Sequence, residues 1–134
     1  MTCIFCAISS GEAPAYILCR NQYALAFLSL EGHPLIVPRC HLSGLNDLDD
    51  QTAAALFQMA TKVSRALRAT IGCEGINLIL SDGVAAGQDV FHVHLNVKPR
   101  WNGDDVILRW DTSTAPEITR AELASALKKQ LSTL

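Results

Sequence analysis

Two histidines stand two positions apart in a stretch of alternating apolar and polar residues, 90–97. This alternation predicts a half-buried strand with one apolar face, formed by Phe91, Val93, Leu95 and Val97. The opposite face carries His92, His94 and Asn96. A half-buried strand explains the apolar face, but it gives no reason for two imidazoles and an amide on the other. We therefore interpret this polar face as a chemical site.

A histidine in this position is suited to nucleophilic chemistry. A neutral imidazole has a lone pair on one ring nitrogen and a proton on the other. The unprotonated nitrogen can attack phosphorus and hold the transferred group as a phosphoramidate, which divides one displacement into two. A loop at residues 81–88 precedes the histidines and contains Gly83 and Gly87. Its backbone amides, with the Gln88 side chain, could stabilise charge on phosphate oxygens.

The cysteine pattern adds a second candidate site. The chain has five cysteines, of which Cys3 and Cys6 form a Cys-x-x-Cys pair. We see no signal peptide, so we expect a cytoplasmic, reducing location in which structural disulfides are rare. The pair is then interpreted as metal ligands or as a redox pair. The single cysteines are expected to be small buried hydrophobes, at Cys19, Cys40 and Cys73.

Four residues form a possible Cys2His2 metal set: Cys3, Cys6, His41 and His92. Two thiolates and two imidazoles favour Zn²⁺. The histidines lie far from the cysteines in sequence, so a metal-free N-terminal turn and a redox pair remain alternatives. On a strand, His92 and His94 would be two residues apart, roughly 6.5 Å. A metal on His92 could therefore fix the strand that presents His94 without occupying His94.

The elements that would position these residues form an α+β pattern. Short apolar runs predict strands at residues 16–19, 24–30, 35–37, 76–80 and 90–97, and Gly and Pro predict a turn at 9–14. A long helix is expected over about 49–71, with an apolar face of Leu56, Phe57, Ala60, Val63, Leu67 and Ile71. Asp47, Asp49 and Asp50 offer capping oxygens near its start, and Gly72 offers a cap at its end. Thr119-x-x-Glu122 predicts the start of a last helix that ends near Leu131.

Length and composition limit the function classes. The 134 residues, 49% hydrophobic and 18% charged, predict one domain over 1–134 and exclude a disordered chain. The chain has 11 basic and 13 acidic residues, and this balance argues against a nucleic acid polymer as partner. There is no apolar run of membrane-spanning length, so no membrane association is expected.

Residues 87–100 resemble the signature of the histidine triad (HIT) family, His-φ-His-φ-His-φ-φ, in which φ is apolar. The family's opening, Cys-x-x-Cys followed by Gly-Glu-x-Pro-Ala, is matched by Cys3, Cys6 and residues 11–15, and residues 35–41 are similar to its strand, Pro, basic residue and His. The resemblance implies a HIT-like domain: a five-stranded antiparallel sheet, a long helix and a C-terminal helix, paired as a homodimer. It also implies that His94 is the nucleophile and that zinc takes its ligands from Cys3, Cys6, His41 and His92.

The sequence departs from the family at three places. The third triad position is Asn96, which cannot shuttle a proton near neutral pH, although transferase branches carry an amide there. Ser29 stands where an Asp usually contacts ribose, a role that Glu31 could take, and Ser81 stands where Asn or Gln is usual. The expected nucleotide-binding residues are Phe27, Ser29, Glu31, Ser81, Gly87, Gln88, His94 and Asn96, and the expected catalytic residues are His94, Asn96 and Gln88.

These residues favour an enzyme. We expect a purine nucleoside phosphoramidate or dinucleoside polyphosphate hydrolase that acts through a covalent nucleotidyl-His94 intermediate, with no organic cofactor. One alternative is a nucleotidyltransferase or phosphorylase of the same superfamily. Another is a nucleotide-binding module with little catalysis, and a third is a zinc-dependent interaction protein without nucleotide affinity.

Overall fold

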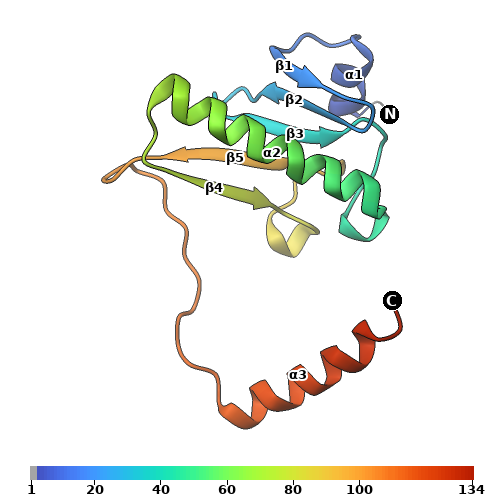
Figure 1. Ribbon diagram of the computed structural model, residues 1–134, viewed down its shortest axis with the longest axis vertical. Coiled ribbons are helices and arrows are strands. Elements are labelled where there is room, and N and C mark those ends of the chain that lie inside the picture. The colour runs from blue at the N-terminus through green and yellow to red at the C-terminus, as the bar shows by residue number, and fades with distance from the viewer. Residues whose placement is uncertain (1–2) are drawn as a thin grey trace. The chain divides into compact units, whose positions relative to one another are not determined.

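A computed structural model describes residues 3–134 of the chain (Figure 1). The chain divides into two compact units, and the boundary in sequence falls between Asp104 and Asp105. In the first unit lie α1 (Ile4–Ser10), β1 (Ile17–Arg20), β2 (Ala24–Leu28), β3 (Pro34–Pro38), α2 (Asp50–Ile71), β4 (Gly75–Leu80) and β5 (Leu95–Arg100). The second unit contains α3 (Glu117–Leu131). The predicted α+β class is confirmed.

The five strands form one antiparallel sheet in the order β1-β2-β3-β5-β4. The last strand in sequence, β5, lies between β3 and β4, with Ile36 opposite Leu95 and Leu35 opposite Asn96. An inner strand has sheet neighbours on both sides, so its backbone position is fixed by two ladders of hydrogen bonds. Residues at the start of β5 are therefore held more firmly than residues on an edge strand.

The long helix α2 lies across one face of the sheet (Figure 1). Its buried residues pack on alternate side chains of the inner strands, and together they form one core: Ala24, Ala26, Ile36, Leu56, Met59, Ala60, Val63, Val93, Leu95 and Val97. The Oδ1 atom of Asp49 accepts the backbone N–H of Thr52 at 2.7 Å, and Gly72 ends the helix at a φ of 64°. The predicted helix and its caps are confirmed. Two residues of the predicted apolar face are exposed, however: Phe57 by 60% and Ile71 by 46%.

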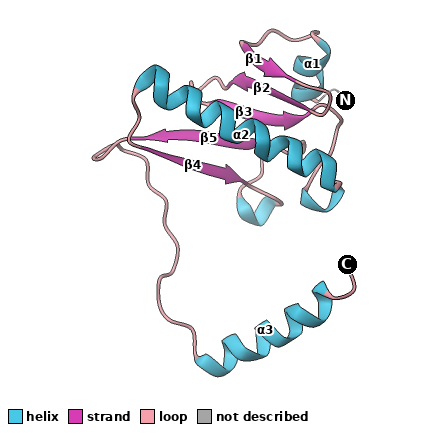
Figure 2. Cartoon of the chain, viewed as in Figure 1, coloured by secondary structure: helices cyan, strands magenta, loops and turns pink. Residues whose placement is uncertain are grey.

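A second core covers the opposite face, where the sequence predicts no helix. Phe5 and Ile8 of α1 pack there on the other set of alternate strand residues, Leu25, Phe27, Leu35 and Val37. Figure 2 shows this short helix near β1 and β2. The turn expected over 9–14 begins only at Gly11, which has a φ of 85°, because Ser9 and Ser10 still belong to α1. The turn was therefore predictable from the sequence, but the helix before it was not.

The histidine segment is not the predicted strand over 90–97, because residues 90–92 form a bend and β5 begins only at Leu95. The backbone N–H of Val93 donates to the carbonyl of Leu42 at 2.7 Å, so this segment pairs with a loop rather than with a strand. The predicted alternation holds for Val93, Leu95 and Val97, which are buried. It is wrong for Phe91, whose side chain is half exposed.

Three further expectations are corrected. The last helix begins at Glu117, after Pro116, and no side chain caps it, so Thr119 lies inside the helix. Cys19 and Cys40 are exposed, and only Cys73 of the three single cysteines is buried. The strand expected over 24–30 ends at Leu28.

No helix among residues 3–134 has both the length and the apolar character that a membrane span requires.

Candidate functional site

The His94 ring has one nitrogen committed to a hydrogen bond and one left for chemistry. Its Nδ1 lies 2.9 Å from the backbone carbonyl oxygen of His92. A carbonyl only accepts hydrogen bonds, so Nδ1 carries the proton and Nε2 carries the lone pair in the neutral ring. Phe5 of α1 packs edge-on against the same ring, with the ring centroids 5.3 Å apart. The ring is thus held in the tautomer and orientation that a nucleophile needs.

Beside His94 lies a cavity of about 920 Å³, on the face of the sheet that α1 covers. Its polar lining consists of Ser29, Glu31, His33, Ser81, Asp89, His94 and Asn96, and apolar residues including Phe5, Phe27 and Leu35 line the rest. Seven of the eight predicted nucleotide-binding residues contribute to this lining: Phe27, Ser29, Glu31, Ser81, Gly87, His94 and Asn96. A mostly apolar hollow with a few convergent polar groups is typical of small-molecule sites.

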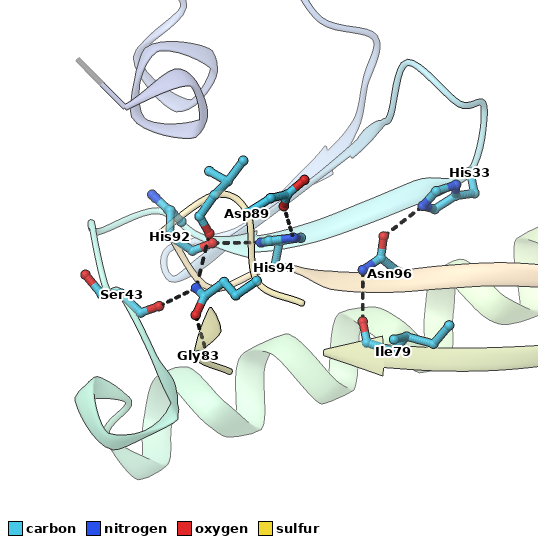
Figure 3. Close-up of polar contacts among 10 residues, drawn as sticks. His33, Ser43, Ile79, Gly83, Asp89, His92, His94 and Asn96 are labelled. Carbon is cyan, nitrogen blue, oxygen red and sulfur yellow. Dashed lines mark hydrogen bonds and ion pairs between the residues drawn. The ribbon is translucent and has the colours of Figure 1, made fainter. Parts of the chain in front are cut away.

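Asn96 has both ends of its amide engaged (Figure 3). Its Nδ2 donates to the carbonyl of Ile79 at 3.0 Å, which orients Oδ1 toward His33. The Nε2–H of His33 then donates to Oδ1 at 2.8 Å, and the other ring nitrogen of His33 lies 3.3 Å from the Ser29 hydroxyl. His33 is buried. Asn96 and Ser29, two of the positions at which the sequence departs from the family pattern, are therefore connected through the imidazole of His33.

The Asp89 carboxylate lies near the open nitrogen of His94 (Figure 3). One carboxylate oxygen is 3.9 Å from His94 Nε2, and the Asp89 side chain is 85% exposed. This carboxylate comes from the loop before the histidines, and it lines the cavity.

Gln88 is buried and does not line the cavity, although the sequence predicts it as a catalytic and nucleotide-binding residue. Its Oε1 accepts the backbone N–H of Gly83 at 2.7 Å. Its Nε2 donates to the carbonyls of Ser43 at 2.7 Å and Val90 at 3.1 Å. The Gly87 N–H is also used, since it donates to Val84. These groups brace the loop that presents Asp89 rather than facing a phosphate.

The four predicted metal ligands come together in space. The ligating atoms of Cys3, Cys6, His41 and His92 all lie within 4.8 Å of one another. Nδ1 of His92 is 3.4 Å from the Cys3 sulfur and 3.6 Å from the Cys6 sulfur, and Nδ1 of His41 is 3.3 Å from the Cys6 sulfur. A tetrahedron with zinc–sulfur and zinc–nitrogen bonds of ordinary length has sulfur–nitrogen edges of about 3.5 Å. The donor set and its spacing therefore fit zinc.

The surroundings of His92 prepare its ring for a metal. Its Nε2–H donates to the carbonyl of Pro38 at 2.8 Å, which leaves Nδ1 unprotonated toward the cysteines. Burial lowers the pKa of His92 and so favours the neutral ring. Burial raises the pKa of the Cys6 thiol, and the adjacent Cys3 adds to the effect. The Cys6 thiol without a cation thus resists ionisation, which a bound dication would offset.

Comparison with known proteins shows the family to which the chain belongs. The profile of the HIT domain matches residues 10–103. The chain belongs to the HIT family. An uncharacterised HIT-like protein of Methanocaldococcus jannaschii is 31% identical over 131 residues, which cover 95% of this chain and 97% of the relative.

Two solved HIT structures are similar over nearly the whole chain. A zinc-bound histidine triad family protein from Mycobacterium smegmatis has a TM-score of 0.75 and 36% identity, and the match covers 100% of this chain and 99% of that one. A histidine triad nucleotide-binding protein from Candida albicans has a TM-score of 0.88 and 26% identity, with 98% and 99% covered.

The sequence alone does not place His33 at the site, and the sequence analysis gave no role to Asp89. His33 follows the loop that ends β2, so only the sheet register, which sets Leu35 opposite Asn96, brings it to the site. Asp89 is adjacent to the signature in sequence, and its charge beside two histidines was a signal that could have been used.

Proposed function

We propose that this protein is a nucleotide hydrolase or nucleotidyltransferase that acts through a covalent nucleotidyl-His94 intermediate. The single observation that carries the proposal is the His94 ring: Nδ1–H donates to His92 at 2.9 Å, and Nε2 is left unprotonated beside the cavity. The substrates we propose are purine nucleoside phosphoramidates or dinucleoside polyphosphates. Membership of the HIT family supports a nucleotide as ligand.

The proposed reaction has two displacements at phosphorus. The lone pair of Nε2 forms a nitrogen–phosphorus bond while the bond from phosphorus to the leaving group breaks. The leaving group departs with that electron pair and takes a proton from solvent. A water oxygen then attacks phosphorus, the nitrogen–phosphorus bond breaks with its electrons returning to Nε2, and the proton of the water passes to solvent. In transfer, an oxygen of a second phosphate replaces water.

The cavity offers suitable partners for the rest of a nucleotide. We propose that the base packs on the apolar wall near Phe27, that Ser29 and Glu31 hold the ribose hydroxyls, and that Ser81 contacts the phosphate. Asn96 lines the cavity through a side chain tied to Ile79 and His33. We propose that Asn96 positions other groups in the reaction, because an amide neither gains nor loses a proton near neutral pH. Gln88 supports the loop from behind.

We propose that the metal site is a structural zinc site made by Cys3, Cys6, His41 and His92. A bound zinc would crosslink the N-terminal helix to the segment that carries His94. The zinc-bound relative from Mycobacterium smegmatis supports the choice of metal.

We further propose that residues 1–134 act as a single HIT domain, that two copies form a homodimer, and that the protein works in the cytoplasm. Measurement of mass in solution tests the dimer, and a strictly monomeric protein at micromolar concentration would refute it.

Trapping the intermediate tests the nucleophile. Wild-type protein and His94→Ala are mixed briefly with an adenosine phosphoramidate, and their intact masses are measured. We expect a mass increase of one adenylyl group in wild type, mapped to His94, and steady turnover that His94→Ala loses by at least about a thousandfold. Equal turnover by the two proteins would remove His94 from the mechanism.

A nucleotide-binding module with little catalysis is the second candidate, and Asn96 favours it. Both ends of its amide are held within the protein, so this position offers no proton to the leaving group. Calorimetry with AMP and GMP, run beside the turnover assays, separates the two candidates. Binding of either nucleotide without turnover of any donor supports the module.

A further inference from the structure

The charges that line the cavity are of one sign. Among the described lining residues there are two carboxylates, Asp89 and Glu31, and no lysine or arginine. The two imidazoles are already committed, because His94 offers its lone pair and His33 donates to Asn96. A site for a polyanion usually gathers lysine, arginine or several open N–H groups. This lining therefore does not suit a ligand with many negative charges.

The Asp89 carboxylate lies close enough to His94 for its negative charge to affect catalysis. Its carboxylate oxygen is 3.9 Å from His94 Nε2, the atom proposed to attack phosphorus. The reacting phosphorus and the phosphates bonded next to it would lie within the screening length of that carboxylate, about 8 Å at physiological salt. Each added negative charge on the leaving group is therefore repelled, whereas an amine leaving group, neutral or protonated, is not.

We propose that Asp89 is a specificity-determining residue that selects the nucleotidyl donor by the charge of its leaving group. The site would take nucleotides with an uncharged or cationic leaving group, such as the amine of a nucleoside phosphoramidate, and would discriminate against dinucleoside polyphosphates. This inference rests on the proposed function and narrows its substrate class.

A comparison of two donors that deliver the same adenylyl group tests the proposal. The values of kcat/KM are measured for an adenosine phosphoramidate and for a diadenosine polyphosphate, in wild type, Asp89→Asn and Asp89→Lys. We expect wild type to prefer the phosphoramidate. Asp89→Asn should shift the ratio toward the polyphosphate by about tenfold, and Asp89→Lys should shift it further. The matched control is Glu31→Gln, which removes the other lining carboxylate and should shift the ratio less.

Salt provides an independent readout. Added salt should raise kcat/KM for the polyphosphate in wild type, because it screens the repulsion, and the same salt should have little effect in Asp89→Asn. An unchanged donor ratio in both Asp89 variants, with turnover intact, would overturn the charge selection and leave the proposed function standing.

If wild type turns over neither donor, the proposed catalysis is wrong. Binding measurements then test whether Asp89 selects ligands by charge. Calorimetry with AMP and ATP should show weaker binding of ATP to wild type, and a smaller difference for Asp89→Asn. Equal preference in the two proteins, or no binding at all, would overturn the proposal.

Discussion

The backbone carbonyl of His92 accepts the Nδ1–H of His94 at 2.9 Å, while the ring of His92 faces the sulfurs of Cys3 and Cys6. One residue thus sets the tautomer of the candidate nucleophile and belongs to the candidate metal site. The two sites share the backbone segment 92–94. The Val93 N–H in this segment also donates to the carbonyl of Leu42. Disturbance of the metal site should therefore reach His94 without any change in the cavity itself.

Loss of a metal ligand is the first test of this link. We expect Cys6→Ser to hold less than about 0.2 zinc per chain, against about one in wild type, because a serine hydroxyl is a poor zinc ligand. The Tm and the turnover of a nucleoside phosphoramidate should both fall, although Cys6 does not line the cavity. Metal content is measured by elemental analysis after gentle purification.

The matched control for that variant is Cys40→Ser. Cys40 precedes His41 in sequence, but it is exposed and lies outside the cluster of candidate ligands. It should keep the zinc content, Tm and turnover of wild type. Equal zinc in the Cys6 and Cys40 variants would show that Cys6 is not a ligand.

The link between His33 and Asn96 gives a second prediction. His33→Ala removes the donor to Asn96 Oδ1 and leaves a void beside a partly buried amide. We expect a loss of about 1–3 kcal/mol in the free energy of unfolding, which is the usual effect of leaving a buried polar atom unpaired. Urea unfolding measures this loss.

His33→Gln provides the comparison, since its side-chain amide can donate to the same oxygen. It should recover part of the stability and part of the turnover. If the Ala and Gln variants are equally stable, the hydrogen bond to Asn96 contributes nothing to the fold.

The sequence predicted most of this architecture because its patterns are local. The helix over 50–71 has a cap at each end and a clear apolar period, so both its limits were correct to within one residue. The exposure of Phe57 and Ile71 was not predictable, because α2 is long and straight and the sheet covers only part of its apolar stripe.

The errors arise where tertiary contacts replace local rules. Residues 90–94 have the alternation of a strand, but Val93 pairs with a loop carbonyl 51 positions away. The helix α1 is short and has no side-chain cap, so it shows little local signal, and packing of Phe5 and Ile8 on the sheet stabilises it. The His33–Asn96 pair depends on the register between β3 and β5, which sequence patterns do not specify.

The cap of α2 predicts a specific pH dependence. The hydrogen bond from the Thr52 backbone N–H lowers the pKa of Asp49 below its ordinary value of 3.8. The folded state therefore holds the charged form more firmly than the unfolded chain does. This contribution to stability is present above that ordinary value and is lost as the pH falls through the lower folded value.

Asp49→Ala should accordingly have a lower Tm than wild type at pH 7, and the difference should shrink as the pH falls below about 4. Asp49→Asn keeps an oxygen that accepts from Thr52 but loses the charge, so its Tm at neutral pH should lie between those of wild type and Asp49→Ala. Thermal unfolding followed by circular dichroism across pH 3 to 7 measures both. A constant difference between wild type and the Ala variant would mean that the charge of Asp49 has no part in the cap.

Gln88 distinguishes a bracing role from direct contact with substrate. Its side chain makes three hydrogen bonds within the protein, to Gly83, Ser43 and Val90, and it is buried. Gln88→Ala leaves those backbone groups without partners, and we expect the free energy of unfolding to fall by about 1–3 kcal/mol. The exposed Gln51→Ala on α2 is the control and should change stability little. Because the loop also carries Asp89, turnover by Gln88→Ala should fall as well. If Gln88→Ala instead lost turnover with its urea midpoint unchanged, Gln88 would act on the substrate directly, and the loop would not depend on it.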